Sequence, residues 1–301
     1  MTGAAGFIGS HVAAYLEDQG HEVIRSDISI PSSSTSVWKR ADLTSLNDTE
    51  RAVEGVDSVC HIGGIGDVYL AADSPQLAIH VNGCGTSNIL SASSRNRVRR
   101  FVYASSWEVY GDPIYQPADE QHPCRPHHPY AISKLVGDLL TQGRVNGANL
   151  QTTALRLGTA YGSRMRKNAV ISSFVRLAIR GEPLVIRGSG EQFRQFTHVS
   201  DIAKAFSLAL GADTLRPVYN IASSERITIR DLAKQVASRI ASTVMSTASR
   251  PGDAPSLYVD SRLAERELRW RTDVPFINGL NAYIDNVQDE YPEAASPEAS
   301  R

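Results

Sequence analysis

Tyr130 and Lys134 are the two side chains of this 301-residue sequence whose types and spacing best suit proton transfer. On an α-helix, residues four positions apart share a face, so the phenol and the ammonium group would project side by side. A free tyrosine has a pKa of about 10 and is a poor base at neutral pH, but an adjacent ammonium group favours the phenolate. Because this spacing also occurs on ordinary helix surfaces, the rest of the chain decides whether the pair is catalytic.

A second polar segment precedes the pair and includes Ser106 and Glu108. It follows the apolar run 101–104, which predicts a buried strand, so its side chains are expected at the carboxyl end of that strand. Residues 112–129 contain five prolines and predict an irregular, well-fixed loop. The helix after this loop carries the pair, and the side chains that we expect it to bury are Leu135, Leu139 and Leu140.

A glycine-rich stretch opens the chain with the spacing of a dinucleotide-binding loop. Small residues there let the backbone approach a diphosphate at the N-terminus of the next helix, where free N–H groups and the helix dipole favour negative charge. Asp27 ends the strand expected over 21–27 and can accept hydrogen bonds from an adenosine ribose, which favours NAD over NADP. The candidate residues of the loop are Gly3, Gly6, Phe7, Ile8 and Gly9.

Only Met1 and Thr2 precede this loop, whereas a dinucleotide fold requires a buried first strand leading into it. We therefore expect that the natural start lies several codons upstream and that an apolar strand is encoded there. The genomic sequence tests this expectation, because a stop codon immediately upstream of Met1 would contradict it.

Short apolar runs alternate with helical patterns through the first half of the sequence. Such alternation predicts right-handed crossovers and a parallel sheet, in which ligands bind outside the carboxyl ends of the strands. The main strands are expected over 57–62, 101–104 and 150–157. The groups that fall at their carboxyl edge are the glycine loop, Asp27, Gly63, Ser106 and Tyr130. Later helices are expected over 171–180, 199–210, 229–240 and 263–268.

The composition argues against several classes of function. The 31 basic and 32 acidic residues give a formal net charge of -1, which provides no electrostatic footprint for nucleic acid. No apolar run approaches the ~18 to 20 residues that a membrane helix needs. Cys60, Cys84 and Cys124 lack metal-site spacing and predict free thiols in a reducing cytoplasm, with neither disulfides nor a metal centre.

With these motifs assembled, the sequence resembles the extended short-chain dehydrogenase/reductase family, specifically its NAD-dependent nucleotide-sugar epimerases and dehydratases. The resemblance covers nearly the whole chain. Besides the glycine loop and the strand 57–61, it rests on Asn82-x-x-Gly-Thr-x-Asn, Ser-Ser-x-Glu-Val-Tyr-Gly, Tyr130-x-x-x-Lys134, Gly-x-Gly-x-Gln-x-Arg194 and Arg250-Pro-Gly-Asp.

The resemblance implies an α/β protein: a Rossmann-type doubly wound parallel sheet with a smaller α/β C-terminal substrate domain. We expect the NAD-binding domain over 1–157, with 197–222 returning to it, and the substrate-binding domain over 158–196 and 223–288. The composition of residues 289–301 predicts a disordered tail.

By the same resemblance Tyr130 is the catalytic acid/base and also contacts the cofactor. Lys134 holds the nicotinamide ribose and favours the phenolate, and Ser106 hydrogen-bonds the reacting sugar hydroxyl. Asp42 and Leu43 would flank the adenine. The other contacts implied are Gly63 and Asn82 for the cofactor and Thr159, Arg194 and Arg250 for the substrate. The planar guanidinium groups of these arginines suit the substrate diphosphate.

The chemistry shared by the family is oxidation of the sugar at C4, in which the phenolate takes the hydroxyl proton and hydride passes to NAD. Reduction of the rotated keto intermediate gives epimerisation, removal of the C5 proton followed by elimination gives dehydration, and loss of a C6 carboxylate gives decarboxylation. Glu108 matches the glutamate that can act as the C5 base in dehydratases and some decarboxylases. Trp107 replaces the Asp that protonates the leaving hydroxyl in hexose 4,6-dehydratases.

We therefore expect an enzyme, an NAD-dependent UDP-hexose 4-epimerase that acts on a nucleotide sugar. A dehydratase or decarboxylase that uses Glu108 is the alternative reaction. A non-catalytic NAD-binding protein is the alternative of a different class, and the intact Ser106, Tyr130 and Lys134 argue against it. Family members often dimerise through the tyrosine helix and the helix before it, so the resemblance implies a homodimer.

Overall fold

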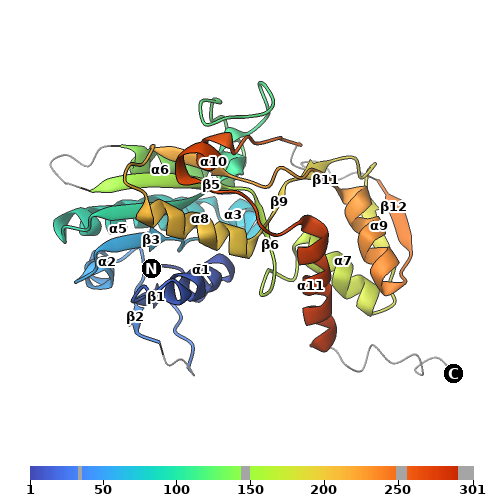
Figure 1. The fold of residues 1–301 in the computed structure, drawn as a ribbon, viewed down its shortest axis with the longest axis horizontal. Coiled ribbons are helices and arrows are strands. Elements are labelled where there is room, and N and C mark those ends of the chain that lie inside the picture. Colours follow the sequence, from blue (N-terminus) through green and yellow to red (C-terminus); the bar gives the residue numbers. More distant parts are fainter. Residues whose placement is uncertain (33–35, 144–149, 249–255, 291–301) are drawn as a thin grey trace.

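The computed structural model describes residues 1–32, 36–143, 150–248 and 256–290 (Figure 1). Its larger part is organised around a parallel sheet. Thr2 forms parallel bridges with both Ser26 and His61, and so joins two groups of strands. In order across the sheet, the strands are β2 (Trp38–Arg40), β1 (Arg25–Asp27), β3 (Ser58–His61), β4 (Arg100–Ser106), β5 (Gln151–Leu157) and β10 (Val218–Ile221).

Helices cover both faces of this sheet, as its central strand shows. Phe101 and Tyr103 of β4 point into one hydrophobic core, whereas Val102 and Ala104 point into another, because successive side chains of a strand alternate. The first core also contains α2 (Leu46–Val53) and α5 (Gly85–Arg95). The second contains α1 (Phe7–Asp18), α8 (Val199–Gly211) and α10 (Arg262–Leu268). The prediction of a doubly wound α/β fold is confirmed.

Helix α6 (Pro129–Gln142) packs against β4 and β5, but not in the way that we expected. Leu139 and Leu140 are 57% and 37% exposed, and Leu135 is only half-buried. The face turned to the protein carries small and polar residues: Ala131, Ser133, Lys134, Gly137, Asp138 and Thr141. Gly137 allows this close packing, since a Cβ there would stand 2.4 Å from the Tyr103 hydroxyl. The prediction that α6 buries its leucines is wrong.

Three short elements connect β3 to α5. They are α3 (Val68–Asp73), α4 (Pro75–Ile79) and a π-helical turn, His80–Cys84. Asp67 caps α3, because its Oδ1 accepts hydrogen bonds from the backbone N–H groups of Tyr69 and Leu70 at 2.9 and 3.3 Å. Both α3 and α4 lie against α6.

A further hydrophobic core lies at the other end of the molecule (Figure 1). Its helices are α7 (Val170–Ile179), α9 (Ile229–Ile240) and α11 (Phe276–Asp289). The short strands around it pair as β7 (Leu184–Arg187) with β12 (Val244–Thr247), β8 (Phe193–Arg194) with β11 (Ile227–Thr228), and β6 (Thr159–Tyr161) with β9 (Phe196–His198). Helix α11 and strand β12 were not predicted. The expected disordered tail lies almost wholly outside the described residues.

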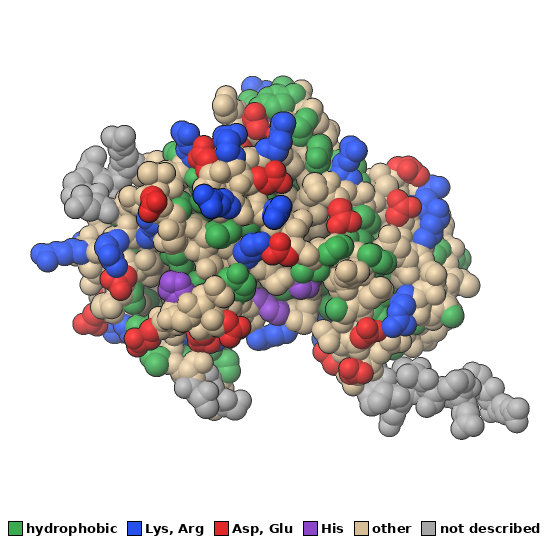
Figure 2. Space-filling model, in the orientation of Figure 1, with side chains coloured by type: hydrophobic (Ala, Val, Ile, Leu, Met, Phe, Trp, Pro, Cys, Tyr) green, Lys and Arg blue, Asp and Glu red, His purple; other side chains and the backbone are tan. Residues whose placement is uncertain are grey.

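Charges of both signs are interspersed over the face of the molecule drawn in Figure 2, without a large area of one sign. Within the described residues, no helix is long and apolar enough to cross a membrane.

Candidate active site

Helix α6 presents Tyr130 and Lys134 toward the carboxyl edge of the sheet. Pro129 occupies its first turn, and the His128 ring accepts a hydrogen bond from the Tyr130 backbone N–H at 3.3 Å. This N-cap fixes the start of the helix, so the register of the two side chains is set locally. Tyr130 is half-buried and Lys134 is buried.

The Lys134 ammonium lies 4.6 Å from the centroid of the Tyr103 ring, whose π face attracts a cation. Burial lowers the pKa of Lys134 to about 8, and the negative charge of Asp138, one turn further along α6, opposes that shift. Lys134 is therefore mostly charged at neutral pH, and its charge is lost as the pH rises through that value.

The pKa of Tyr130 is raised, first by burial and then by the negative charge of Glu108, while hydrogen bonding to Ser106 and the charge of Arg166 lower it. Desolvation has the largest of these effects, and the role of Lys134 in favouring the phenolate stays a prediction.

Ser106 and Glu108 stand at the carboxyl end of β4, where the sequence placed them. The Ser106 Oγ accepts a hydrogen bond from the Glu108 backbone N–H at 3.2 Å and caps a short 3-10 helix, Trp107–Tyr110. Burial raises the pKa of Glu108 to about 7, although Arg194 and Arg166 lower it. Glu108 is therefore part charged and part neutral at physiological pH.

Behind these residues is a buried ionic network that sequence reasoning missed. Asp138 Oδ2 accepts hydrogen bonds from Ser105 Oγ at 2.6 Å and from Arg156 Nε at 3.0 Å. The Arg156 guanidinium also lies 4.8 Å from the centroid of the Tyr110 ring. The network joins β5 to β4 and α6, the two elements that carry Ser106, Tyr130 and Lys134. Its only signal in the sequence was an aspartate one helical turn after Lys134.

The glycine loop has backbone contacts that no other residue type allows. A Cβ on Gly9 would stand 1.9 Å from the Gly3 carbonyl oxygen, and one on Gly3, whose φ is +70°, would stand 2.5 Å from the Gly63 nitrogen. Gly6 is the N-cap of α1 and provides no side-chain cap, so the first N–H groups of that helix, at Phe7 and Ile8, are left for an anion. These residues fit the diphosphate of a dinucleotide.

Asp27 lies beside the glycine loop. Its Oδ2 accepts a hydrogen bond from the Ala5 backbone N–H at 3.0 Å, and its Oδ1 accepts one from Ser29 at 3.3 Å. Leu43 packs near Gly63 and Gly85, and the Asp42 carboxylate caps a turn by accepting hydrogen bonds from Thr44.

Asn82 is buried and is fully engaged with the protein. It exchanges two hydrogen bonds with Ile65 and donates a third to Ser133 of α6 at 2.8 Å. It therefore fixes the loop after β3 to the catalytic helix, and its predicted contact with the cofactor stays a prediction.

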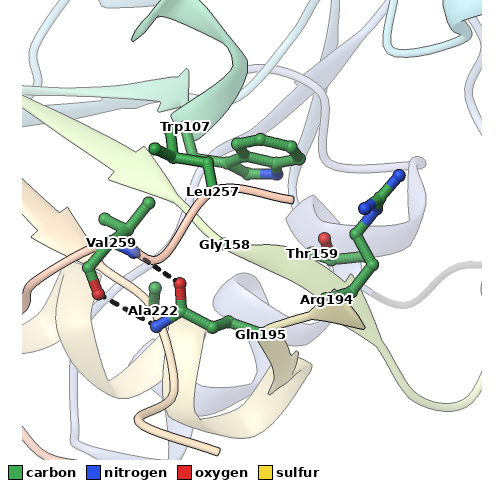
Figure 3. Close-up of a pocket in the computed structure, with 8 residues that line it drawn as sticks. All are labelled: Trp107, Gly158, Thr159, Arg194, Gln195, Ala222, Leu257 and Val259. Carbon is green, nitrogen blue, oxygen red and sulfur yellow. Dashed lines mark hydrogen bonds between the residues drawn. The ribbon is translucent and has the colours of Figure 1, made fainter. Parts of the chain in front are cut away.

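A pocket opens next to the catalytic edge (Figure 3). Trp107 and Leu257 lie on one side, and Thr159 and Arg194 lie across from them, with the Arg194 guanidinium 5.9 Å from the Trp107 ring centroid. The described residues that line it are Trp107, Gly158, Thr159, Arg194, Gln195, Ala222, Leu257 and Val259. Two of the predicted substrate residues thus meet here, whereas Arg250 lies outside the described residues.

Gln195 holds one wall of this pocket. Its side-chain amide accepts a hydrogen bond from the Val259 backbone N–H at 2.7 Å and donates one to the Val259 carbonyl at 2.9 Å. It also donates to the Ser223 carbonyl at 2.6 Å. A single buried amide therefore fixes two segments that come from distant parts of the sequence. Neither this amide nor the pocket wall at Leu257 and Val259 was anticipated.

The fold, the glycine loop and the Tyr130–Lys134 helix define a class of proteins, and comparison with known proteins identifies it. A model of the NAD dependent epimerase/dehydratase family matches residues 1–222, and the chain belongs to this family. It is an enzyme family that uses NAD, so the predicted family, enzyme class and cofactor are confirmed.

Among similar proteins of known structure is MoeE5, solved in complex with UDP-glucose and NAD, which is 30% identical with a TM-score of 0.88 over 96% of this chain and 98% of that one. A UDP-glucose 4-epimerase of Thermotoga maritima, solved with UDP-glucose, is 25% identical with a TM-score of 0.88 over the same shares of the two chains. UDP-glucuronic acid decarboxylase 1 of Danio rerio is 29% identical over 98% of this chain and 74% of its own.

Proposed function

We propose that this protein is a nucleotide-sugar 4-epimerase that acts on a UDP-hexose through a transient 4-keto sugar. The observation that carries the proposal is Trp107, which follows β4 and lines the pocket at the position where hexose 4,6-dehydratases have the aspartate that protonates the leaving hydroxyl. Elimination of a C6 hydroxyl needs a proton donor at the leaving oxygen, and the Trp107 indole cannot serve as one. Epimerisation needs only the oxidation step and its reversal.

In the proposed reaction, Tyr130 and Ser106 act on the proton of the C4 hydroxyl. In our mechanism Ser106 hydrogen-bonds the sugar hydroxyl, and Tyr130 takes its proton as the C4–H bond breaks. When bound, NAD would supply the acceptor and later the donor of the C4 hydride, and its positive charge would favour the Tyr130 phenolate. Lys134 holds the nicotinamide ribose, and its positive charge also favours the phenolate. After the keto sugar rotates in the pocket, Tyr130 returns the proton to the C4 oxygen.

Incubation of purified protein with UDP-glucose, UDP-GlcNAc, UDP-glucuronic acid and dTDP-glucose tests the proposal. A C4 epimer without net formation of NADH is the expected result. A stable 4-keto product, or release of carbon dioxide from UDP-glucuronic acid, would instead establish the dehydratase or decarboxylase. Glu108 keeps that second function open, because it is close enough to Tyr130 for its charge to shift the tyrosine pKa, and its own pKa is about 7.

The Glu108→Gln variant separates the two functions. For an epimerase we expect kcat to change by less than ~10-fold, because Glu108 transfers no proton in that reaction. If Glu108 were the base that removes the C5 proton, the substitution would lower kcat by ~10²- to 10⁴-fold. Removal of the negative charge also lowers the pKa of Tyr130, so the rising limb of the pH–rate profile should move to lower pH. If Glu108 were the C5 base, the wild-type rate would fall as the pH drops through about 7 and the variant would be inactive.

We also propose that the enzyme is a homodimer formed through α4 and α6. Exposed apolar side chains gather on these helices and on α3, with Leu139 57%, Leu77 45% and Leu70 45% exposed. A second copy of the chain would cover them, because isologous contact of the same patch closes a two-fold dimer.

Light scattering after size-exclusion chromatography tests the interface. Leu139→Asp should convert the dimer to a monomer, because it would place a charge in a desolvated contact. Leu46→Asp is the matched control, since Leu46 of α2 is equally exposed at 57% but lies on another helix, and it should leave the dimer intact. A monomeric wild-type protein at micromolar concentration would refute the proposal.

A further inference from the structure

The segment Gly162–Asn168 leaves the pocket strand β6 and crosses back to the cofactor loop. The His11 ring of α1 donates a hydrogen bond through Nε2 to the Ser163 carbonyl at 2.9 Å. Arg164 Nη2 donates to the Ala5 carbonyl, within the glycine loop, at 3.4 Å. Further along, Arg166 forms an ion pair with Asp67 at 3.3 Å. The segment therefore touches both loops that border the cofactor site.

Arg164 stands out within this segment. Its backbone φ is +64°, in the left-handed region that residues with a Cβ disfavour and that glycine or asparagine adopt more readily. Its side chain is exposed, and no carboxylate of the described residues lies within ion-pair distance of it. The guanidinium contacts a neutral carbonyl oxygen, so most of its donors remain available to an anionic ligand.

The position of that carbonyl indicates which ligand this is. Ala5 lies one residue before Gly6, the N-cap of α1, and the Ala5 N–H is already held by Asp27. The uncapped start of α1 is where the backbone is built to receive a diphosphate. The Arg164 guanidinium reaches the Ala5 carbonyl and therefore lies beside the site expected for the diphosphate. Its planar set of N–H donors matches phosphate oxygens.

We propose that Arg164 is a cofactor-binding residue that donates hydrogen bonds to the diphosphate of NAD. It reaches the cofactor from the substrate side of the molecule, because Gly162–Asn168 continues directly from β6, where Thr159 lines the sugar pocket. The proposal depends on the NAD site and not on which sugar nucleotide is converted.

Calorimetric titration of cofactor-stripped protein with NAD tests the proposal. Arg164→Gly removes the guanidinium and also relaxes the left-handed backbone, so the fold should be retained, with an unchanged or higher melting temperature of the apo protein. We expect the dissociation constant for NAD to rise about tenfold, the scale of one charge-assisted hydrogen-bonding group. Arg164→Asn, which also tolerates the backbone conformation, should give the same loss.

Lys167→Ala is the matched control. Lys167 is exposed in the same segment and makes no hydrogen bond or ion pair with any described residue, so its removal changes the local charge equally. The NAD affinity of the Lys167→Ala variant should stay within about twofold of the wild type, because an exposed charge without a partner contributes little to binding.

Three results would overturn the proposal: unchanged NAD affinity in both Arg164 variants, an equal loss in Lys167→Ala, or weakened UDP binding to the NAD-saturated variants with NAD affinity intact. The last would assign Arg164 to the substrate diphosphate. No sugar substrate is used in the NAD titration, so its failure would leave the proposed epimerase activity standing, and a different sugar reaction would leave the Arg164 result standing.

Discussion

Tyr130→Phe is expected to lower kcat for sugar-nucleotide turnover by about 10³-fold, within the range that a positioned acid/base group contributes. The substitution removes one oxygen atom and keeps the ring that packs beside Ser106 and Glu108. No other side chain of the described residues is then positioned to accept the proton of the C4 hydroxyl, because the Lys134 ammonium group lies against the Tyr103 ring. The readout is the rate of product formation, followed by chromatography or NMR.

Two controls make this result specific. The variant should still contain bound NAD, and its melting temperature should match the wild type, since most of the predicted cofactor contacts and the packing of the ring are kept. Tyr115→Phe removes another hydroxyl, one that donates to Asp119 in an exposed loop, and should leave turnover unchanged. A Tyr130→Phe variant that retained more than a tenth of wild-type kcat would show that the assignment of Tyr130 is wrong.

Asp138→Ala is expected to lower the free energy of unfolding by about 3 to 5 kcal/mol, the usual cost of removing one partner of a buried ion pair. Both Asp138 and Arg156 are buried, so the variant leaves the Arg156 guanidinium without its carboxylate and the Ser105 hydroxyl without its acceptor. Urea denaturation measures the loss. Asp57→Ala, which breaks the exposed pair with Arg99, should change stability little.

The same variant should also affect catalysis, through Lys134. The charge of Asp138 supports the protonated form of Lys134, so its removal lowers the lysine pKa below about 8. The ammonium would then be lost near neutral pH, and the falling limb of the pH–rate profile should move to lower pH. Asp138→Ala/Arg156→Met should recover part of the stability, because no buried charge is left unpaired, but not the pH shift. Failure of the double variant to recover stability would contradict this account.

The sequence located the parts of the site that depend on local spacing. The glycine loop was predictable because close backbone contacts require glycine at fixed intervals, and Tyr130 and Lys134 because four residues make one helical turn. Ser106 followed from the end of an apolar strand. Each of these inferences needs only a short stretch of chain and a single type of element.

Features that depend on which surfaces meet were not predictable in this way. Leu139 and Leu140 fit a helix pattern, but a pattern does not say whether an apolar face meets the protein's own sheet or faces outward. The bond between Asp138 and Arg156 joins a helix to a neighbouring strand, and Gln195 holds Val259 across 64 residues of sequence. The raised pKa of Tyr130 is a balance between burial and several charges, which only the folded arrangement fixes.

The hydrogen bonds of Gln195 bear on how such an enzyme can diversify. In the proposed mechanism, proton transfer depends on α6 and β4, which the Asp138–Arg156 ion pair joins to β5. The pocket that we propose for the sugar is lined by Thr159, Arg194 and Leu257, on other segments, and Gln195 keeps its wall in place. Sugar preference can therefore drift by substitution at the lining positions while the proton-transfer groups stay untouched. A library restricted to these lining positions, with Gln195 held constant, is the natural starting point for engineering new sugar specificities.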